Sequence, residues 1–210
     1  MIIDISRTLS PAIAVWPGDT PFNLRTTLAL NDGATVNLTT LTVSAHTGTH
    51  IDAPYHFQQE GQTVEALPLE TYWGPAQVVS IQQQEGALSP EAFAGYDLTR
   101  APRLLVRTPA SERDPREFSG KFVYPSPELA AYLHEQGIIL YGCDAPSMDA
   151  VDSQSLPGHH ALQANGIAIL EGLDLSRVED GLYELVSLPL KIAGGDGSPV
   201  RAALRALRAA

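Results

Sequence analysis

The sequence predicts an α/β or α+β domain built on a mainly β core. About ten short segments alternate in polarity or are continuously apolar, as strands are, and few segments carry helix signals. The 16 prolines and 17 glycines indicate many turns. The chain has 210 residues and no evident linker, so residues 1–210 are expected to form a single domain.

The N-terminal half contains most of the expected turns and several strands. Residues 1–6 (MIIDIS) are a short apolar run of strand type, and the Pro-Gly pair in 16–21 (WPGDTP) predicts a turn. In 37–46 (NLTTLTVSAH), apolar residues alternate with threonines, which predicts a strand. Further strands are expected at 25–30, 76–82 and 103–108.

The C-terminal half contains the clearest helix signal. Segment 126–137 (SPELAAYLHEQG) has a capping serine, a proline at the first helical position and a terminal glycine. A second helix is expected at 159–166, ending at a glycine. Strands are expected at 138–142, 167–172 and 183–192, whereas the tail from Pro199 could be helix or strand.

The charge and composition exclude several functional classes. The formal net charge of −11 argues against nucleic-acid partners and anionic membrane surfaces, which both need a cationic footprint. No stretch approaches the roughly 20 apolar residues of a membrane span, and the N-terminus does not resemble a signal peptide. Cys143 is the only cysteine, so no intrachain disulfide is possible and a cytoplasmic location is expected.

The segment HTGTHIDAPYH (46–56) concentrates three of the six histidines in the chain. Its threonines, glycine and proline disfavour a helix, and side chains of an extended chain repeat with period two. His46, His50, Asp52 and His56 all occupy even positions, so an extended segment could point them to one side. Two imidazoles and a carboxylate in that arrangement are typical ligands of Zn²⁺ or a similar metal.

A second candidate cluster lies in 159–172 (HHALQANGIAILEG). Glu171 interrupts an apolar strand, and burying a lone carboxylate is costly unless it is paired or coordinated. His159 or His160 could be a further ligand, but adjacent histidines point in different directions. Together with the first cluster, this makes five ligands including two carboxylates, which favours a two-metal site with His56 left to move protons.

These residues also match a known family. Segment 46–57 fits the pattern H-x-G-T-H-x-D-x-P-x-H and resembles the signature of the metal-dependent cyclase-like hydrolases. The H-x11-E spacing from His159 to Glu171 is similar to the second element of that family. Within the family, the chain most resembles the bacterial kynurenine formamidases, also called arylformamidases. Three further segments carry that likeness: VWPGDTPF (15–22), 141–162 and 194–205.

The resemblance implies roles for individual residues. His46, His50 and Asp52 would hold one zinc ion, and Asp52, His159 and Glu171 would hold a second, with Asp52 and Glu171 bridging the two. The spacing to Glu171 selects His159 over its neighbour as the ligand.

The resemblance also implies the reaction and the fold. His56 would be the catalytic acid/base, and Trp16 would contact the substrate, although Trp16 could instead only staple its turn. The expected reaction is hydrolysis of N-formyl-L-kynurenine to L-kynurenine and formate, in tryptophan degradation.

The implied fold is a swivelling β/β/α fold with a barrel-like β core and flanking helices, assembled as a homodimer. Under this resemblance the tail at 199–208 is a strand, against its helix propensity. Cys143 departs from the aliphatic residue expected there, but a buried cysteine behaves as a small hydrophobe.

Four other functions can be compared with this interpretation. A hydrolase of the same family could act on another aryl or cyclic amide. A non-haem iron oxygenase could use His50, Asp52 and a distal histidine, but would leave His46 and Glu171 without a role. A structural zinc site would normally use cysteines, of which this chain has one. A serine hydrolase is disfavoured because the chain lacks a G-x-S-x-G elbow.

The remaining polar residues are expected to be structural. Asp144 is expected to be a loop or turn residue that could also support a metal ligand, and GGDGS (194–198) is expected to be a turn. Loop, turn or surface positions are expected for Ser147, Asp149, Asp152, His134, Arg201 and Arg205.

Overall fold

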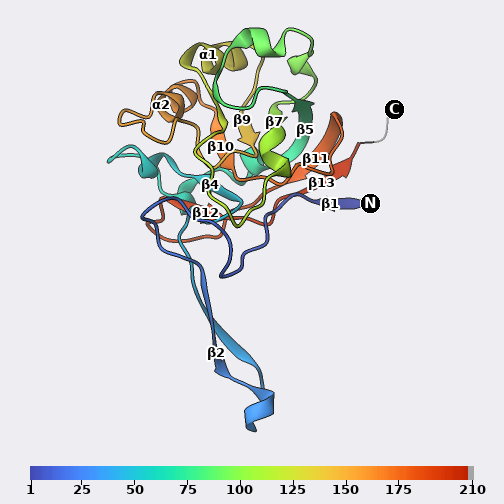
Figure 1. Ribbon diagram of the computed structural model, residues 1–210. Coiled ribbons are helices and arrows are strands. Elements are labelled where there is room, and N and C mark those ends of the chain that lie inside the picture. The colour runs from blue at the N-terminus through green and yellow to red at the C-terminus, as the bar shows by residue number, and fades with distance from the viewer. Residues whose placement is uncertain (208–210) are drawn as a thin grey trace.

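The computed structural model describes residues 1–207, and within them nine strands form one sheet that curls into a half-barrel (Figure 1). Two α-helices flank it, so the predicted α/β class with a mainly β, barrel-like core is confirmed. Across the sheet the strands are β1 (Ile2–Asp4), β13 (Ala203–Ala206), β11 (Gly181–Val186), β5 (Trp73–Ser80), β7 (Arg103–Arg107), β9 (Leu140–Cys143), β10 (Ala168–Glu171), β4 (His50–Asp52) and β12 (Gly197–Pro199).

The sheet is parallel at its centre and antiparallel at both edges. Strands β5, β7, β9 and β10 run parallel to their neighbours in this group, and β4 and β12 continue the sheet antiparallel on one side. On the other side, β11, β13 and β1 are antiparallel, so the first and last strands of the chain are paired. The short strands β6 (Gly86–Leu88) and β8 (Val123–Pro125) form a separate parallel pair.

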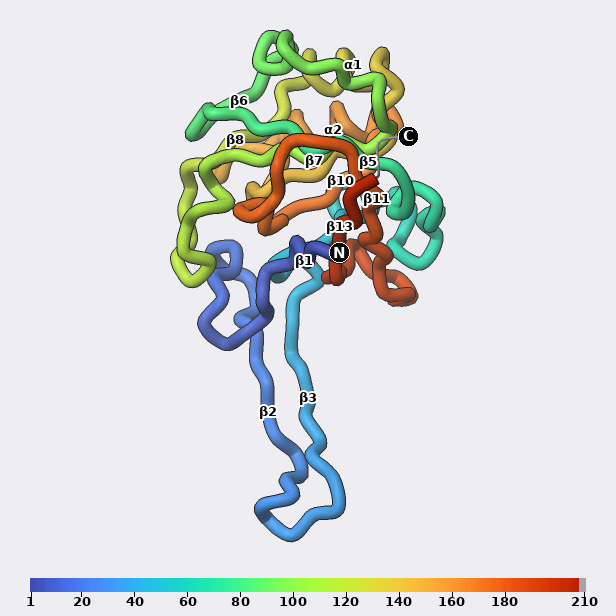
Figure 2. The backbone as a smooth tube through the Cα atoms, turned by 90° about the vertical axis from the view of Figure 1, so that its right-hand side faces the viewer, coloured from blue at the N-terminus to red at the C-terminus, as the bar shows by residue number. Residues whose placement is uncertain are grey.

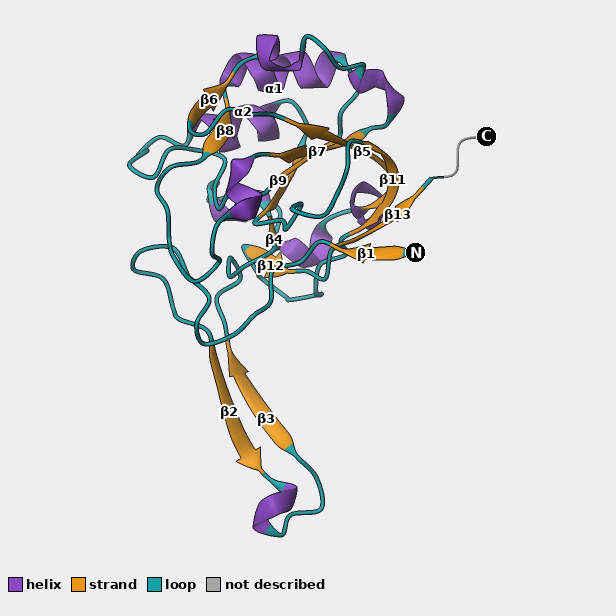
Figure 3. Ribbon diagram, turned by 45° about the vertical axis from the view of Figure 1, so that its right-hand side comes forward, coloured by secondary structure: helices purple, strands orange, loops and turns teal. Residues whose placement is uncertain are grey.

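Alternation along the central strands divides the core into two layers. In β7, Leu104 and Val106 face the layer that contains the helices, whereas Leu105 faces the inside of the curl. Both helices, α1 (Pro127–Glu135) and α2 (Pro157–Ala164), lie over the first of these faces (Figure 3). Cys143 is fully buried in this same layer, as a small hydrophobe would be.

Helix α1 begins as the sequence predicts. The Oγ atom of Ser126 accepts a hydrogen bond from the backbone N–H of Leu129 at 3.2 Å, and Pro127 occupies the first turn. Helix α2 starts two residues earlier than expected, at Pro157, and is preceded by Leu156 with φ of 45°. A left-handed conformation is strained for a leucine, and such strain is often found beside functional sites.

The strands expected at 25–30 and 37–46 form a separate arm. Strands β2 (Asn23–Leu28) and β3 (Leu38–Thr42) pair with each other in a hairpin that extends away from the sheet, as the two views of Figures 1 and 2 show. Every residue of both strands is exposed. The alternating leucines therefore predicted strands correctly, but they are not covered by the core of this chain.

Two expected boundaries shift for identifiable reasons. The strand expected at 183–192 ends at Val186, before Pro189, which lacks the N–H that a ladder needs. In the tail, β13 forms despite helix-favouring alanines because it pairs with both β1 and β11. The tail strand implied by the family resemblance is present at 203–206, and residues 208–210 lie outside the described residues.

Among residues 1–207, no helix has the length and apolar character that a membrane crossing requires.

Candidate metal centre and active-site cavity

Strands β4 and β10 place three of the predicted ligands on one face of the sheet. His50 is the register partner of Glu171, and Asp52 is the partner of Ile169. Between them Ile51 points into the opposite core layer, so His50 and Asp52 share the face from which Glu171 projects. His50 and Asp52, which occupy even positions of β4, therefore point to one side as predicted.

The other two histidines of the motif reach the site by turns rather than by a continuous strand. His46 lies in a turn before β4, and Gly48 has φ of 70°, a conformation that favours glycine. His56 ends a short 3-10 helix, Pro54–His56, that follows the strand.

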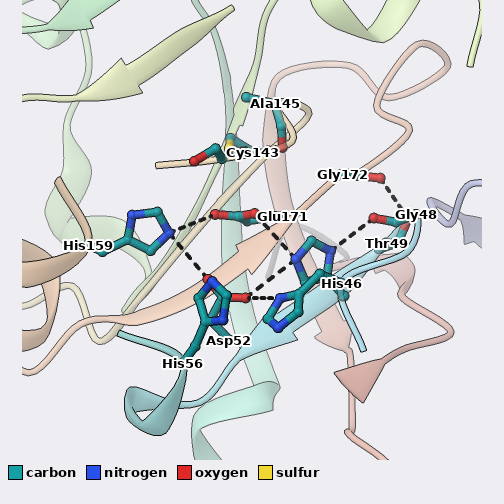
Figure 4. A network of polar contacts seen from close by, with 12 residues as sticks. His46, Gly48, Thr49, Asp52, His56, Cys143, Ala145, His159, Glu171 and Gly172 are labelled. Atoms are coloured by element: carbon teal, nitrogen blue, oxygen red, sulfur yellow. Dashed lines mark hydrogen bonds and ion pairs between the residues drawn. The ribbon is translucent and has the colours of Figure 1, made fainter. Parts of the chain in front are cut away.

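Two carboxylates lie between two imidazoles at the centre of the cluster. The Nε2 atom of His50 is 3.4 Å from Oδ1 of Asp52 and 3.3 Å from Oε2 of Glu171. The Nε2 atom of His159, which comes from α2, is 3.4 Å from Oδ2 of Asp52 and 3.5 Å from Oε1 of Glu171. Each carboxylate thus directs one oxygen to each histidine (Figure 4), as a pair bridging two cations would.

The third imidazole completes one side of this cluster. The Nδ1 atom of His46 lies 2.9 Å from Oδ1 of Asp52, the same oxygen that faces His50. The ligand atoms of His46, Asp52 and His56 can also meet within 4.8 Å of one another, as can those of His50, Asp52 and Glu171. The predicted ligands are therefore brought together, whereas His160 is exposed on the outer side of α2.

Hydrogen bonds orient the two imidazoles that face the carboxylates. His50 donates from Nδ1 to the carbonyl of Gly48 at 3.1 Å, and His159 donates from Nδ1 to Oδ2 of Asp149 at 2.6 Å. Both rings therefore direct Nε2 inward, the atom that would bind a metal.

Asp149, which was expected to be a loop residue, supports the candidate ligand His159, whereas Asp144 does not take the supporting role that was open to it. Asp144 instead accepts hydrogen bonds from the backbone and side chains of Thr108 and Ser111. Asp149 also accepts from the backbone N–H groups of Gly158 and His159, at 2.7 and 3.1 Å, and so caps α2. A Cβ at Gly158 would lie 2.0 Å from the carbonyl of Met148, so only glycine permits this approach.

The burial of the cluster requires positive charge beside the carboxylates. The side chains of Asp52 and Glu171 are 1% and 3% exposed. Their Oδ2 and Oε1 atoms have no hydrogen-bond partner among residues 1–207. Buried carboxylate oxygens without donors are costly, and a metal ion would satisfy them, so this donor set fits a metal.

The ionisation of the cluster leads to the same conclusion. Burial lowers the pKa of His50, but hydrogen bonds to Asp52 and Glu171 outweigh burial and raise that pKa to about 10. Burial likewise lowers the pKa of His159, and the hydrogen bond to Asp149 together with the nearby carboxylates of Asp52 and Glu171 raises it to about 12. Burial raises the pKa of Asp52, but the neighbouring imidazoles of His159, His46 and His50 hold it well below its usual range. Without metal, two imidazolium groups therefore balance the two carboxylates.

The cluster opens into a cavity of about 640 Å³. Trp16 lines it and packs edge-on against Phe118, with ring centroids 5.4 Å apart and planes at 80°. Trp16 thus both contacts its neighbours and offers a surface to the cavity. His56 also lines the cavity, with its ring centroid 4.0 Å from that of His46.

Sequence reasoning missed Asp196, which it placed in a simple turn. The Oδ2 atom of Asp196 lies 3.1 Å from Nε2 of His46 and 3.5 Å from Nδ1 of His56. Its neighbour Gly197 lies under the His46 ring, since a Cβ there would approach Cε1 of His46 to 2.9 Å. The available signal was an acid between glycines, which is equally typical of a turn.

Comparison with known proteins agrees with this geometry. The model of the Cyclase family, described as "Putative cyclase", matches residues 3–150. This chain belongs to the Cyclase family. A curated relative, the kynurenine formamidase of Salinibacter ruber, is 46% identical over 205 residues, covering 97% of each chain.

Solved structures of Cyclase-family hydrolases have the same fold. A potential metal-dependent hydrolase with cyclase activity superposes with a TM-score of 0.83 at 27% identity, covering 97% of this chain and 96% of the other. Isatin hydrolase A from Labrenzia aggregata gives 0.83 at 26% identity, covering 99% and 94%. The predicted family and the expectation of an amide-hydrolysing, metal-dependent enzyme are thereby confirmed.

Proposed function

We propose that this enzyme hydrolyses N-formyl-L-kynurenine to L-kynurenine and formate, a step of tryptophan degradation. The observation that carries the proposal is the pair of buried carboxylates shared between His50 and His159 at the base of an aromatic-walled cavity. The 46% identity to a kynurenine formamidase supports the choice of substrate. We further propose that residues 1–210 form one hydrolase domain and that the enzyme is located in the cytoplasm.

The proposed cofactor is a pair of zinc ions. His46, His50 and Asp52 would hold one ion, and Asp52, His159 and Glu171 the other, with Asp52 and Glu171 bridging. The two unpartnered carboxylate oxygens support this assignment. When bound, two such ions lower the pKa of water and polarise a carbonyl oxygen.

The protein side chains contribute orientation and proton transfer. Water adds to the formyl carbon, and the bond from that carbon to the aniline nitrogen then breaks. His56 lines the cavity beside His46 and is placed to give the departing nitrogen a proton. The faces of Trp16 and Phe118 suit the aromatic ring of the substrate.

The exposed arm supports a homodimer. Leu24 pairs with Leu41 and, beyond a bulge, Leu28 pairs with Leu38, which puts a leucine pair on each face of the ribbon. An isolated two-stranded hairpin is marginally stable in water, so a second surface is needed to cover it. The arm carries only Arg25 and Asp32 as charged residues, so it can approach a second copy of this acidic chain without net repulsion.

The test combines elemental analysis with turnover on purified protein. Metal per chain is measured, and the near-ultraviolet absorbance of the free aniline product is followed with N-formyl-L-kynurenine. About two zinc ions per chain with turnover abolished by a chelator would support the proposal. Two metals without turnover would redirect it to cyclic aryl amides such as isatin, which the structural likeness to isatin hydrolase makes the second candidate. One iron, or no metal, would overturn it.

A further inference from the structure

Backbone hydrogen bonds hold the segment that carries Asp196 next to β4 and the residues that follow it. The backbone carbonyl of Asp196 accepts a hydrogen bond from Ala53 at 2.9 Å, and that of Gly195 accepts one from Val64 at 2.9 Å. Directly after it, β12 pairs with β4, with Gly197 opposite Asp52. The Asp196 side chain therefore projects from an anchored backbone, although it is 44% exposed.

One oxygen of Asp196 lies near two histidines with different expected roles. His46 is an expected metal ligand and His56 the expected acid/base. Oδ2 lies 3.1 Å from Nε2 of His46 and 3.5 Å from Nδ1 of His56. The two rings are adjacent, with centroids 4.0 Å apart and planes inclined by 36°. An ionised carboxylate only accepts hydrogen bonds, so a ring nitrogen that faces it carries the proton.

The consequence for each ring follows from this geometry once a metal is bound. Both nitrogens of His46 face carboxylates, and a metal held between Nδ1 and Asp52 would leave the single proton on Nε2, facing Asp196. With its proton on Nδ1, His56 keeps Nε2 as the atom that accepts or delivers a proton. A bare imidazole in water is under no such constraint and exchanges between both forms.

We propose that Asp196 is a positioning residue that sets the tautomers of His46 and His56 together, through a single carboxylate oxygen. The inference rests on the proposed function for the role of His56, but the tautomers themselves do not depend on the substrate. Asp196 touches no reacting atom in this assignment; it acts through the two rings.

The test compares Asp196→Ala and Asp196→Asn with the wild type, all loaded with zinc. The side-chain oxygen of asparagine can still accept from a ring N–H, whereas alanine offers no acceptor. Asp97→Asn is the matched control, because it removes a carboxylate from an exposed turn where Asp97 only contacts Thr99. Long-range 1H–15N NMR spectra report the histidine tautomers without any turnover, and His56→Ala assigns the His56 signals.

The expected results separate positioning from other roles. In the wild type, His56 carries its proton on Nδ1; in Asp196→Ala it shifts to a mixture with Nε2–H, and Asp196→Asn keeps the wild-type tautomer. The kcat of Asp196→Ala falls by about 10- to 100-fold, the usual cost of losing such an outer partner, with KM little changed. Asp196→Asn loses less, and Asp97→Asn nothing.

Three outcomes would overturn the inference. An unchanged His56 tautomer in Asp196→Ala would show that the carboxylate does not set it. A raised KM with unchanged kcat would instead make Asp196 a contact for the substrate ammonium group. Equal losses in the alanine and asparagine variants would show that charge, rather than hydrogen bonding, matters. If the wild type does not turn over the substrate, the proposed function fails while the NMR result still decides the tautomers.

Discussion

The Nδ1 atom of His159 lies 2.6 Å from Oδ2 of Asp149, and the same carboxylate caps the helix that carries His159. One side chain thereby fixes both the position of the helix terminus and the orientation of the ring. The expected metal ligand and its helix are therefore coupled through Asp149.

The substitution Asp149→Ala is expected to weaken metal binding by about 10- to 100-fold, because the His159 ring loses the partner that directs Nε2 inward. The lost helix cap should also lower the free energy of unfolding by about 1 kcal/mol. Competition with a zinc-binding dye measures the affinity, and thermal unfolding measures the stability. Asp152→Ala, in an exposed loop, is the control. Wild-type zinc affinity in Asp149→Ala would show that His159 is not a ligand or needs no support.

The adjacent histidines of α2 provide a second comparison. His159→Ala should lose about one metal equivalent per chain, because its Nε2 faces both carboxylates that are proposed to bind metal. His160→Ala should keep its metal, since His160 is exposed. Elemental analysis of the two variants, purified in parallel, distinguishes them. Equal metal content in both would contradict the ligand assignment.

His56→Ala should retain its metal and lose kcat by roughly 100-fold or more, as expected for a lost general acid/base. Metal analysis and steady-state kinetics on the same preparation make the measurement. His134→Ala is a suitable control, because His134 is exposed on α1 and contacts only the carbonyl of Asn165. Loss of metal in His56→Ala would instead make His56 a ligand, which its distance to His46 and Asp52 permits.

Gly197→Ala tests the packing under His46. The added Cβ would lie 2.8 Å from the carbonyl of Ile51 and 2.9 Å from Cε1 of His46, so the ring or the strand must move. Zinc affinity should fall, and stability should fall by about 1–3 kcal/mol, the usual cost of overpacking. Gly95→Ala is the control, because nothing lies within 4 Å of its Cβ. Equal behaviour of the two variants would refute the close contact.

The metal-free protein should lose stability as the pH rises above neutrality. The pKa values of His50 and His159 are raised to about 10 and about 12 in the folded state, above the ordinary value of 6.5. Their contribution is therefore complete below about pH 6.5 and is lost as the pH rises through the folded pKa values.

Thermal unfolding with chelator at about pH 6 and about pH 9 tests this, with the lower melting temperature expected at the higher pH. Zinc bound by these two rings would replace their protons, so its addition at neutral pH should release protons, which an indicator dye detects. A melting temperature that does not fall between these two pH values, or zinc uptake without proton release, would contradict the ionisation described for the cluster.

The sequence predicted the core strands and α1 because their signals are local. A capping serine, a first-turn proline and continuous apolar runs each act within a few residues. The arm and β13 were harder to predict for opposite reasons. The leucines of the arm alternate as those of a sheet do, yet this chain does not cover them, whereas β13 overrides its alanine-rich propensity by pairing on both sides.

The candidate site likewise contains residues that the sequence predicted and residues that it did not. The cluster at 46–56 and the buried Glu171 could be found because their signals are visible along the chain, whereas the choice of His159 over His160 came only from the family resemblance. Asp149 and Asp196 could not be distinguished from loop acids, since their partners are 10 and 150 positions away. Such supporting residues are recognised by their short distance to the histidines in the folded structure. A single sequence does not reveal that distance.

The register of β4 also has a consequence for synthesis of the chain. Its three residues, 50–52, bond to β10 at 168–171 and to β12 at 197–199. A nascent chain emerging from the ribosome exposes its first three histidines long before either neighbouring strand exists. Such non-local pairing forms slowly and late. The proposed metal site can therefore be completed only after residues 168–171 and 197–199 have left the ribosome, so loading of the metal is expected to follow the synthesis of these strands.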